Sequence, residues 1–211
     1  MTVATRAVEP RSRRYDPAET RQRVLEAANL LFSTKGFAAT GTADIARAAD
    51  VSEGSIFYHF GSKKNLLIDI GRMYGERMIA VMQGDDALED LEPGIMITRC
   101  IDFCIEHKEW EALTGEVCAE GKPKTMMAAE AEPFYHASRE VTCEWVAKQM
   151  TAAMAKRGTT GVNIPFAAQL TYAVVGETIE AVISTGDQER RSEVLAETIR
   201  FVRAACGYHA A

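Results

Sequence analysis

The sequence has no run of about 18 apolar residues, the length that a membrane-spanning helix requires. Its most apolar stretch, residues 173–183, is interrupted by Glu177 and Glu180. The arginines near the start have no apolar segment behind them, unlike those of a secretory or twin-arginine signal. We therefore expect a cytoplasmic protein with no membrane partner.

Cysteines and catalytic motifs are also scarce. Five cysteines occur in 211 residues, and this odd number at scattered positions resembles no disulfide framework. There is no G-x-S-x-G elbow, Walker loop, G-x-G-x-x-G or H-E-x-x-H motif. These absences argue against an enzyme with a helical fold, the alternative from another functional class, and we expect no cofactor.

Negative charge predominates in the whole chain, whose formal net charge is −6, but the two ends differ. Residues 1–65 carry 10 Lys or Arg against 7 Asp or Glu, whereas the remainder carries 14 against 23. The basic N-terminal part favours contact with a polyanion. The acidic total argues against non-specific DNA compaction, since that depends on neutralising many phosphates.

Apolar residues recur at intervals of three and four along most of the chain, and no segment alternates like a strand. The ends of the first four helices are predicted from the residues that cap or break them, namely Pro17, Gly36, Gly41, Ser52 and Ser62. Further helices are predicted over residues 94–107, 109–120, 124–157, 164–185 and 188–206. The fold class is all-α.

Two short predicted helices joined by the turn "ADVS" form a helix-turn-helix, and the second is sized for the major groove of DNA. In "SEGSIFYHF", Ile56 and Phe60 are predicted to face the core, with Phe57 beside them. Tyr58 and His59 then point outward with donors that suit phosphate oxygens.

Further DNA contacts are predicted on either side of these two residues. Ser55 is small enough to lie against a base edge. Lys63 adds a cation beside the exposed N–H groups that begin the next helix. Arg13 and Arg14 belong to a polar segment, residues 1–16, which we expect to be a flexible arm that reaches DNA.

Residues 20–67 closely resemble the DNA-binding domain of the TetR family of bacterial transcriptional regulators. The matching pieces are "AANLLFSTKGFAAT", "DIARAADVS" and "SIFYHFGSK", in this order and at the family's spacing. The resemblance implies a three-helix DNA-binding domain, which we place at residues 17–66, and a homodimer on a palindromic operator in double-stranded DNA. The DNA-facing positions that it implies are Ser52, Ser55, Tyr58, His59 and Lys63.

The chain departs from the family pattern at three positions of this domain. Gly41 replaces a frequent Ser or Thr, and neighbouring Thr40 or Thr42 is expected to supply the missing hydroxyl. Phe57 replaces a frequent Tyr. Glu53 replaces a frequent Lys and would repel a nearby phosphate, so we expect the N-terminal arginines to contribute more of the affinity.

Residues 67–211 are expected to form a larger helical domain for effector binding and dimerisation. The family resemblance places a small-molecule effector, of unknown identity, among the middle helices, where large apolar and soft polar side chains are mixed. The candidate effector-binding residues are Phe103, His107, Trp110, Cys118, Tyr135, Cys143, Trp145 and Tyr172. For each of them, ordinary core packing is the alternative.

Cys100, Cys104 and His107 are spaced i, i+4 and i+7, so they share one helical face. Thiolate and imidazole groups bind zinc or copper, and Cys118 would complete four ligands. A metal- or thiol-sensing repressor is therefore an alternative function. The opposing interpretation is that buried cysteines act as small apolar side chains in a core or pocket wall.

The last two predicted helices are expected to form the dimer interface, as they do in the TetR family. Small residues in the first of them permit close helix approach, and the second carries an apolar stripe. The candidate interface residues are Ala173, Gly176, Glu180, Val194, Ile199 and Val202. The leading functional prediction is a homodimeric repressor that a small-molecule effector releases from its operator.

Overall fold

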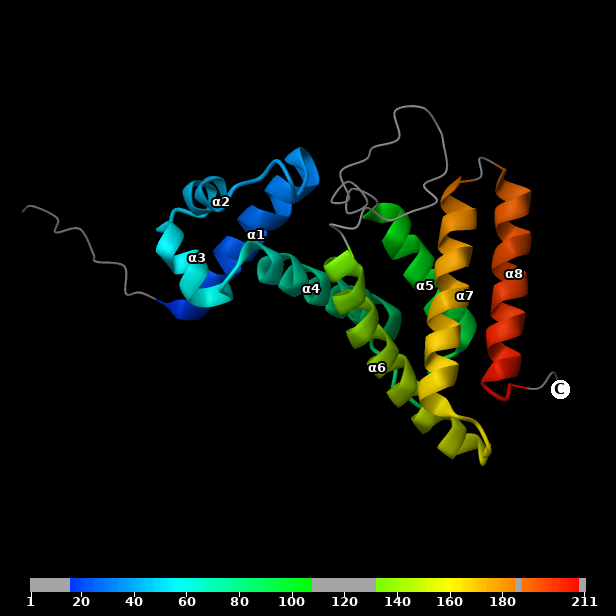
Figure 1. The fold of residues 1–211 in the computed structure, drawn as a ribbon. Helices are drawn as coiled ribbons and strands as arrows, with labels where there is room; N and C mark the ends of the chain where they lie inside the picture. Colours follow the sequence, from blue (N-terminus) through cyan, green and yellow to red (C-terminus); the bar gives the residue numbers. More distant parts are fainter. Residues whose placement is uncertain (1–15, 108–131, 185–186, 209–211) are drawn as a thin grey trace, which may run out of the picture.

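The structure, a computed structural model, describes residues 16–107, 132–184 and 187–208. Within these ranges the chain forms eight α-helices and no strand (Figure 1). The first four are α1 (Pro17–Lys35), α2 (Thr42–Ala48), α3 (Glu53–Phe60) and α4 (Lys63–Gln83). The others are α5 (Pro93–Glu106), α6 (Glu132–Arg157), α7 (Ile164–Ser184) and α8 (Gln188–Ala205). The predicted all-α class is confirmed.

Local capping groups determine where the first helices begin. Asp16 accepts a hydrogen bond from the Ala18 N–H at 2.8 Å and so satisfies a free donor at the start of α1. Ser52 does the same for α3 by accepting from the Ser55 N–H at 3.2 Å. Ser62 caps α4 in the same manner. These helices therefore begin at the residues that the sequence predicted.

A small unit is formed by α1, α2, α3 and the first half of α4. Its core consists of side chains that are fully buried or nearly so, among them Val24, Phe32, Ile45, Ile56, Leu66 and Ile70. Since the last two belong to α4, the predicted boundary between residues 66 and 67 falls inside a continuous helix. Helix α4 therefore belongs to both parts of the molecule.

The second half of α4 packs against α5 and α6 in a larger unit that α7 and α8 complete (Figure 1). Where α4 crosses α6, two glycines allow the backbones to touch. A Cβ atom at Gly71 would lie 2.3 Å from the Phe134 carbonyl oxygen, and one at Gly75 would lie 3.0 Å from the Ser138 carbonyl oxygen. No larger residue fits at Gly71 without a shift of one helix.

Several predicted segments fall beyond the ranges given above. The predicted helix over residues 109–120 is among them, as are the start of the predicted helix 124–157 and nearly all of the N-terminal arm. In the part of the chain that the structure does describe, no helix has the length and apolar character needed to cross a membrane.

Candidate DNA-binding face and ligand cavity

Helix α3 presents one apolar side to the core and leaves the opposite side in solvent. Ile56 is fully buried and Phe60 is 5% exposed, whereas the Tyr58 side chain is 80% exposed. His59 is half-buried, and its ring lies edge-on to Tyr58 with 5.0 Å between the ring centroids. The predicted orientation of Ile56, Phe60 and Tyr58 is confirmed.

The prediction that Phe57 faces the core is wrong, because its side chain is 51% exposed. Residues of an α-helix are about 100° apart, so the stripe through Ile56 and Phe60 turns Phe57 to the flank. A helix of eight residues that packs along the stripe through Ile56 and Phe60 has no room for a third large inward side chain. Phe57 therefore adds an apolar surface beside Tyr58.

Hydroxyls and one carboxylate meet where α2 and α3 begin. Thr42 donates a hydrogen bond to the Glu53 carboxylate and so joins the first residues of the two helices. Next to it, the hydroxyls of Ser52 and Ser55 lie 2.9 Å apart. The structure thus brings the predicted DNA contacts Thr42, Ser52 and Ser55 together. It also adds the carboxylate of Glu53, which occupies the Thr42 hydroxyl.

The ammonium group of Lys63 binds the loop between α1 and α2. It donates hydrogen bonds to the carbonyl oxygens of Phe37 at 2.9 Å and Thr40 at 3.0 Å, and it lies 4.2 Å from the centroid of the Phe37 ring. An ammonium has three N–H donors, so one remains for a phosphate. Short sequence patterns do not predict this loop contact, because the residues that it joins are more than 20 positions apart.

The basic residues around this face are only partly those that were predicted. Arg13 and Arg14 are not among the described residues. Arg47, in the last turn of α2, was missed; its side chain is 78% exposed and pairs with Asp44 at 3.2 Å. Its position in the helix before the recognition helix is the signal that would have pointed to it.

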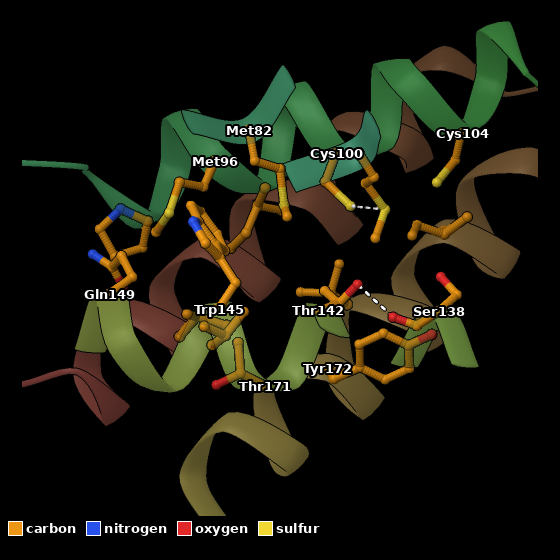
Figure 2. Close-up of a pocket in the computed structure, with 18 of the residues that line it drawn as sticks. Met82, Met96, Cys100, Cys104, Ser138, Thr142, Trp145, Gln149, Thr171 and Tyr172 are labelled. Atoms are coloured by element: carbon orange, nitrogen blue, oxygen red, sulfur yellow. Dashed lines mark hydrogen bonds between the residues drawn. The ribbon is translucent and has the colours of Figure 1, made fainter. Parts of the chain in front are cut away.

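A cavity of about 220 Å³ lies in the larger unit, with walls from α4, α5, α6, α7 and α8 (Figure 2). The predicted effector residues that line it are His107, Tyr135, Trp145 and Tyr172. Phe103 does not line it, because the side chain is buried and stacks on the His107 ring at 4.2 Å. Cys143 is half-buried away from the lining. Trp110 and Cys118 belong to a range without described coordinates.

The cavity wall is largely apolar and rich in sulfur. The sulfur-bearing side chains that line it are Met78, Met82, Met96, Met150, Cys100, Cys104 and Cys206. A hydrogen bond with Cys104 and burial raise the pKa of the Cys100 thiol. Burial raises the pKa of Tyr172 to about 12 and that of Tyr74 still further. These groups are therefore protonated, and uncharged, at neutral pH.

The structure does not bring Cys100, Cys104 and His107 together as metal ligands. The Cys100 thiol donates a hydrogen bond to the Met78 sulfur at 3.6 Å, and the Cys104 sulfur lies 3.6 Å from the Tyr74 hydroxyl. Across the three described ranges, no group of three or more His, Cys, Asp or Glu side chains is placed to hold a metal ion. The metal-sensing alternative gains no support there.

Helix α7 leaves one side in solvent along its length. Phe166 is 58% exposed and Leu170 is 48% exposed, and the predicted interface residues Ala173, Gly176 and Glu180 are exposed further along the helix. A Cβ atom at Gly176 would meet no atom within 4 Å. This side of α7 therefore remains open to a partner.

The predicted interface residues of α8 lie differently. Val202 is 3% exposed and packs in the core of its own protomer together with half-buried Ile199, while Val194 is half-buried. The prediction is therefore corrected for Val202, which offers no surface to a partner. Periodicity identified the apolar stripe but not what it packs against. The large apolar residue that α8 exposes is Phe201, at 57%.

These features define a helix-turn-helix protein with a ligand-sized cavity in a second helical unit. Residues 24–70 match the family described as bacterial regulatory proteins, tetR family. The HTH-type transcriptional regulator LmrA of Bacillus subtilis (strain 168) is 30% identical over 137 residues, which cover 60% of this chain and 67% of LmrA. The chain belongs to the TetR family of transcriptional regulators.

Two further relatives match over shorter stretches. The HTH-type transcriptional regulator AcrR of Shigella flexneri is 40% identical over 60 residues, or 28% of each chain. The repressor AcnR of Corynebacterium glutamicum is 33% identical over 73 residues, which are 35% of this chain and 39% of AcnR. The match therefore spans well under two thirds of either relative.

Solved structures share the fold over nearly the whole chain. Salmonella enterica GusR superposes with a TM-score of 0.61 and 21% identity, covering 92% of this chain and 98% of GusR. RolR in complex with the ligand resorcinol gives a TM-score of 0.57 and 14% identity, covering 91% of this chain and 93% of RolR. At these identities the likeness shows the fold alone.

Proposed function

We propose that this regulator is a homodimeric repressor that binds a palindromic operator through α3 and leaves it when a small molecule occupies the cavity. One contact carries the proposal. Phe134 and Ser138 of α6 line the cavity, and their backbones touch α4 at Gly71 and Gly75. Helix α4 begins in the DNA-binding unit, so a molecule against α6 acts on the helix that positions α3.

The release step follows from a shift between two arrangements of α4 and α6. A ligand shifts such an equilibrium only by the difference between its affinities for the two states. The backbones of α4 and α6 touch at Gly71 and Gly75. A small displacement of α6 must therefore move α4 or open the contact. Either change alters the spacing of the two recognition helices in a dimer, and only one spacing fits two half-sites.

On the DNA side, Tyr58, His59 and Lys63 are proposed to contact phosphates, with Arg13 and Arg14 adding charge from the arm. Ser55 is proposed to reach a base edge. The exposure of Tyr58 and the position of the two serines at the start of α3 support this assignment. Phosphate contacts position the protein, whereas base contacts specify the sequence.

Related folds are compatible with a small-molecule effector. RolR, which shares this all-helical fold, was solved in complex with its ligand resorcinol. For the present chain, the cavity in the larger unit is the corresponding candidate site.

Selection of duplexes from a random-sequence library with the full chain tests the DNA-binding part. Fluorescence anisotropy at a stated salt concentration should then show the selected duplex bound at least about 10³-fold more tightly than a shuffled one. Tyr58→Phe should weaken binding to both duplexes alike, whereas Ser55→Ala should change the preference among variants of the selected duplex. Equal affinity of the wild-type chain for selected and shuffled duplexes would contradict the proposal.

A further inference from the structure

The charge of the described cavity wall limits what can bind there. Among the described residues that line the cavity there is no Asp, Glu, Lys or Arg. Burial holds Tyr74 and Tyr172 in their neutral forms, and a hydrogen bond with Cys104 together with burial does the same for Cys100. A charged molecule placed there would lose its hydration without gaining a counter-charge, which is strongly unfavourable. The imidazole among these lining residues, His107, has its Nδ1 2.9 Å from the Phe103 carbonyl oxygen. A neutral occupant therefore suits the described wall better than a charged one.

One polar group in the wall has no partner of its own. Ser138 is 97% buried, as its 3% exposure shows, and its hydroxyl makes no hydrogen bond with any described residue. The nearby Thr142 hydroxyl donates to the Ser138 carbonyl oxygen at 2.8 Å and leaves the Ser138 hydroxyl free (Figure 2). Because Ser138 lines the cavity, its hydroxyl can donate to or accept from a polar group of an occupant.

Other polar groups of the wall are already engaged. The Trp145 indole N–H donates to the Gln83 side chain at 3.2 Å, and the Gln149 amide donates to the Leu91 carbonyl oxygen at 3.2 Å. Tyr172, by contrast, lines the same side of the cavity as Ser138 in Figure 2 and makes no hydrogen bond with a described residue. The hydroxyls of Ser138, Thr171 and Tyr172 therefore remain available, and each can donate or accept.

The size and softness of the wall limit the occupant further. Apolar cavities of about 150 Å³ hold one benzene ring, so about 220 Å³ suits a single ring with a short substituent. Met78, Met82, Met96 and Met150 can adjust to the shape of a ring, because the methionine side chain is unbranched and polarisable.

We propose that the cavity binds a neutral, largely apolar molecule of about one substituted ring, whose single polar group hydrogen-bonds to the Ser138 hydroxyl. This inference rests on the proposed function only in naming that molecule the effector. The binding itself is a property of the cavity and is measured without DNA.

The test uses matched probes on three skeletons, ethylbenzene, naphthalene and octane, each as the unsubstituted hydrocarbon, the alcohol or phenol, the carboxylate and the ammonium. Thermal melting and tryptophan fluorescence of the full chain report binding at pH 7. The ethylbenzene alcohol or phenol should bind saturably and raise the melting temperature more than the naphthalene and octane alcohols, and its carboxylate and ammonium analogues should not.

Two variants test whether the probe binds in the cavity. Ser138→Ala should weaken the best alcohol or phenol about five- to tenfold, the loss of one hydrogen bond, and leave the hydrocarbon of the same skeleton unchanged. Val175→Phe, which puts a larger side chain in the wall, should abolish binding of both. Ser192→Ala, an exposed position on α8, should alter neither.

The results separate this inference from the proposed function. Binding of a charged probe as tight as its neutral analogue, no binding by any neutral probe, or unchanged affinity in Ser138→Ala would overturn the inference. If Val175→Phe does not fold, the Ser138→Ala comparison still decides. A neutral probe that binds as expected but never weakens DNA binding would leave the inference standing and overturn the release step of the proposed function.

Discussion

At the scale of single residues, Lys63 links the recognition face to the loop before α2. Its two hydrogen bonds to the carbonyl oxygens of Phe37 and Thr40 fix that loop, and its position over the Phe37 ring adds a cation–π contact. Lys63→Met keeps the apolar stem and removes the charge and both bonds. We expect the free energy of unfolding to fall by about 1–3 kcal/mol, since bonds to charged groups are stronger than neutral ones.

Urea denaturation measures this change, and Lys64→Met is the matched control. Lys64 is the next residue along α4, and its side chain is exposed. Its replacement should change stability by no more than about 0.5 kcal/mol. Equal effects of the two replacements would mean that the Lys63 contacts contribute nothing to the fold.

The buried tyrosine and thiol of the cavity predict a loss of stability in alkali. Burial raises the pKa of Tyr172 from 10.0 to about 12, and the pKa of Cys100 is raised above 9.0 by its hydrogen bond with Cys104 and by burial. The native state therefore holds these protons more tightly than the unfolded state. Their contribution is complete below about pH 9 and declines as the pH rises toward 12.

Urea denaturation at intervals from pH 8 to pH 11.5 should show this decline. In Tyr172→Phe the decline should be shallower, because one of the groups that titrate in the unfolded state has been removed. A profile of Tyr172→Phe that is parallel to that of the wild-type chain would show that the Tyr172 hydroxyl is not buried in solution.

At the scale of helices, the backbones of α4 and α6 come into direct contact where the two helices cross at Gly71 and Gly75. A methyl group at Gly71 would come within 2.3 Å of the Phe134 carbonyl oxygen, which is backbone and cannot rotate away. Gly71→Ala should therefore lower the free energy of unfolding by about 1–3 kcal/mol despite the better helix propensity of alanine.

Gly54→Ala provides the control for this steric argument. Gly54 also lies in a helix, but a methyl group there would lie 3.7 Å from the Ser52 hydroxyl oxygen, an ordinary contact. Its replacement should leave stability unchanged or raise it by up to about 1 kcal/mol. If both variants melt like the wild-type chain, α4 and α6 are far enough apart at Gly71 to accept a methyl group.

The helices themselves were largely predictable from sequence, whereas their packing was not. Asp16, Ser52 and Ser62 act within three residues of themselves, so the starts of α1, α3 and α4 could be read from short patterns. Phe57 and Val202 were misplaced because the side that a helix buries depends on helices distant in sequence. The same limit explains why four of the eight candidate effector residues line the cavity, and why Ser138, which also lines it, was not among the candidates.

At the scale of the whole molecule, the exposed side of α7 is the proposed meeting point of two chains. Ala173→Arg places a long cation where the chain offers an open, small-residue surface. In a dimer that cation would be desolvated without a counter-charge, so we expect a monomer. Operator affinity should fall by about 10² or more, because the second half-site contact is no longer intramolecular.

Size-exclusion chromatography with light scattering distinguishes the two states. Ala155→Arg, at an exposed position of α6, is the control and should leave the mass and the operator affinity of the wild-type chain unchanged. Persistence of a dimer in Ala173→Arg would move the interface away from this side of α7, with the surface around Phe201 of α8 the next to examine.

The most direct test of the account is to measure the mass of the complex on the selected duplex and on a copy in which one half-site has been scrambled. We predict two chains on an inverted repeat whose centres lie about one helical turn apart, and a loss of affinity of at least about 10² when one half-site is scrambled. A single chain on an asymmetric site, with the scrambled duplex bound as well as the intact one, would contradict the account.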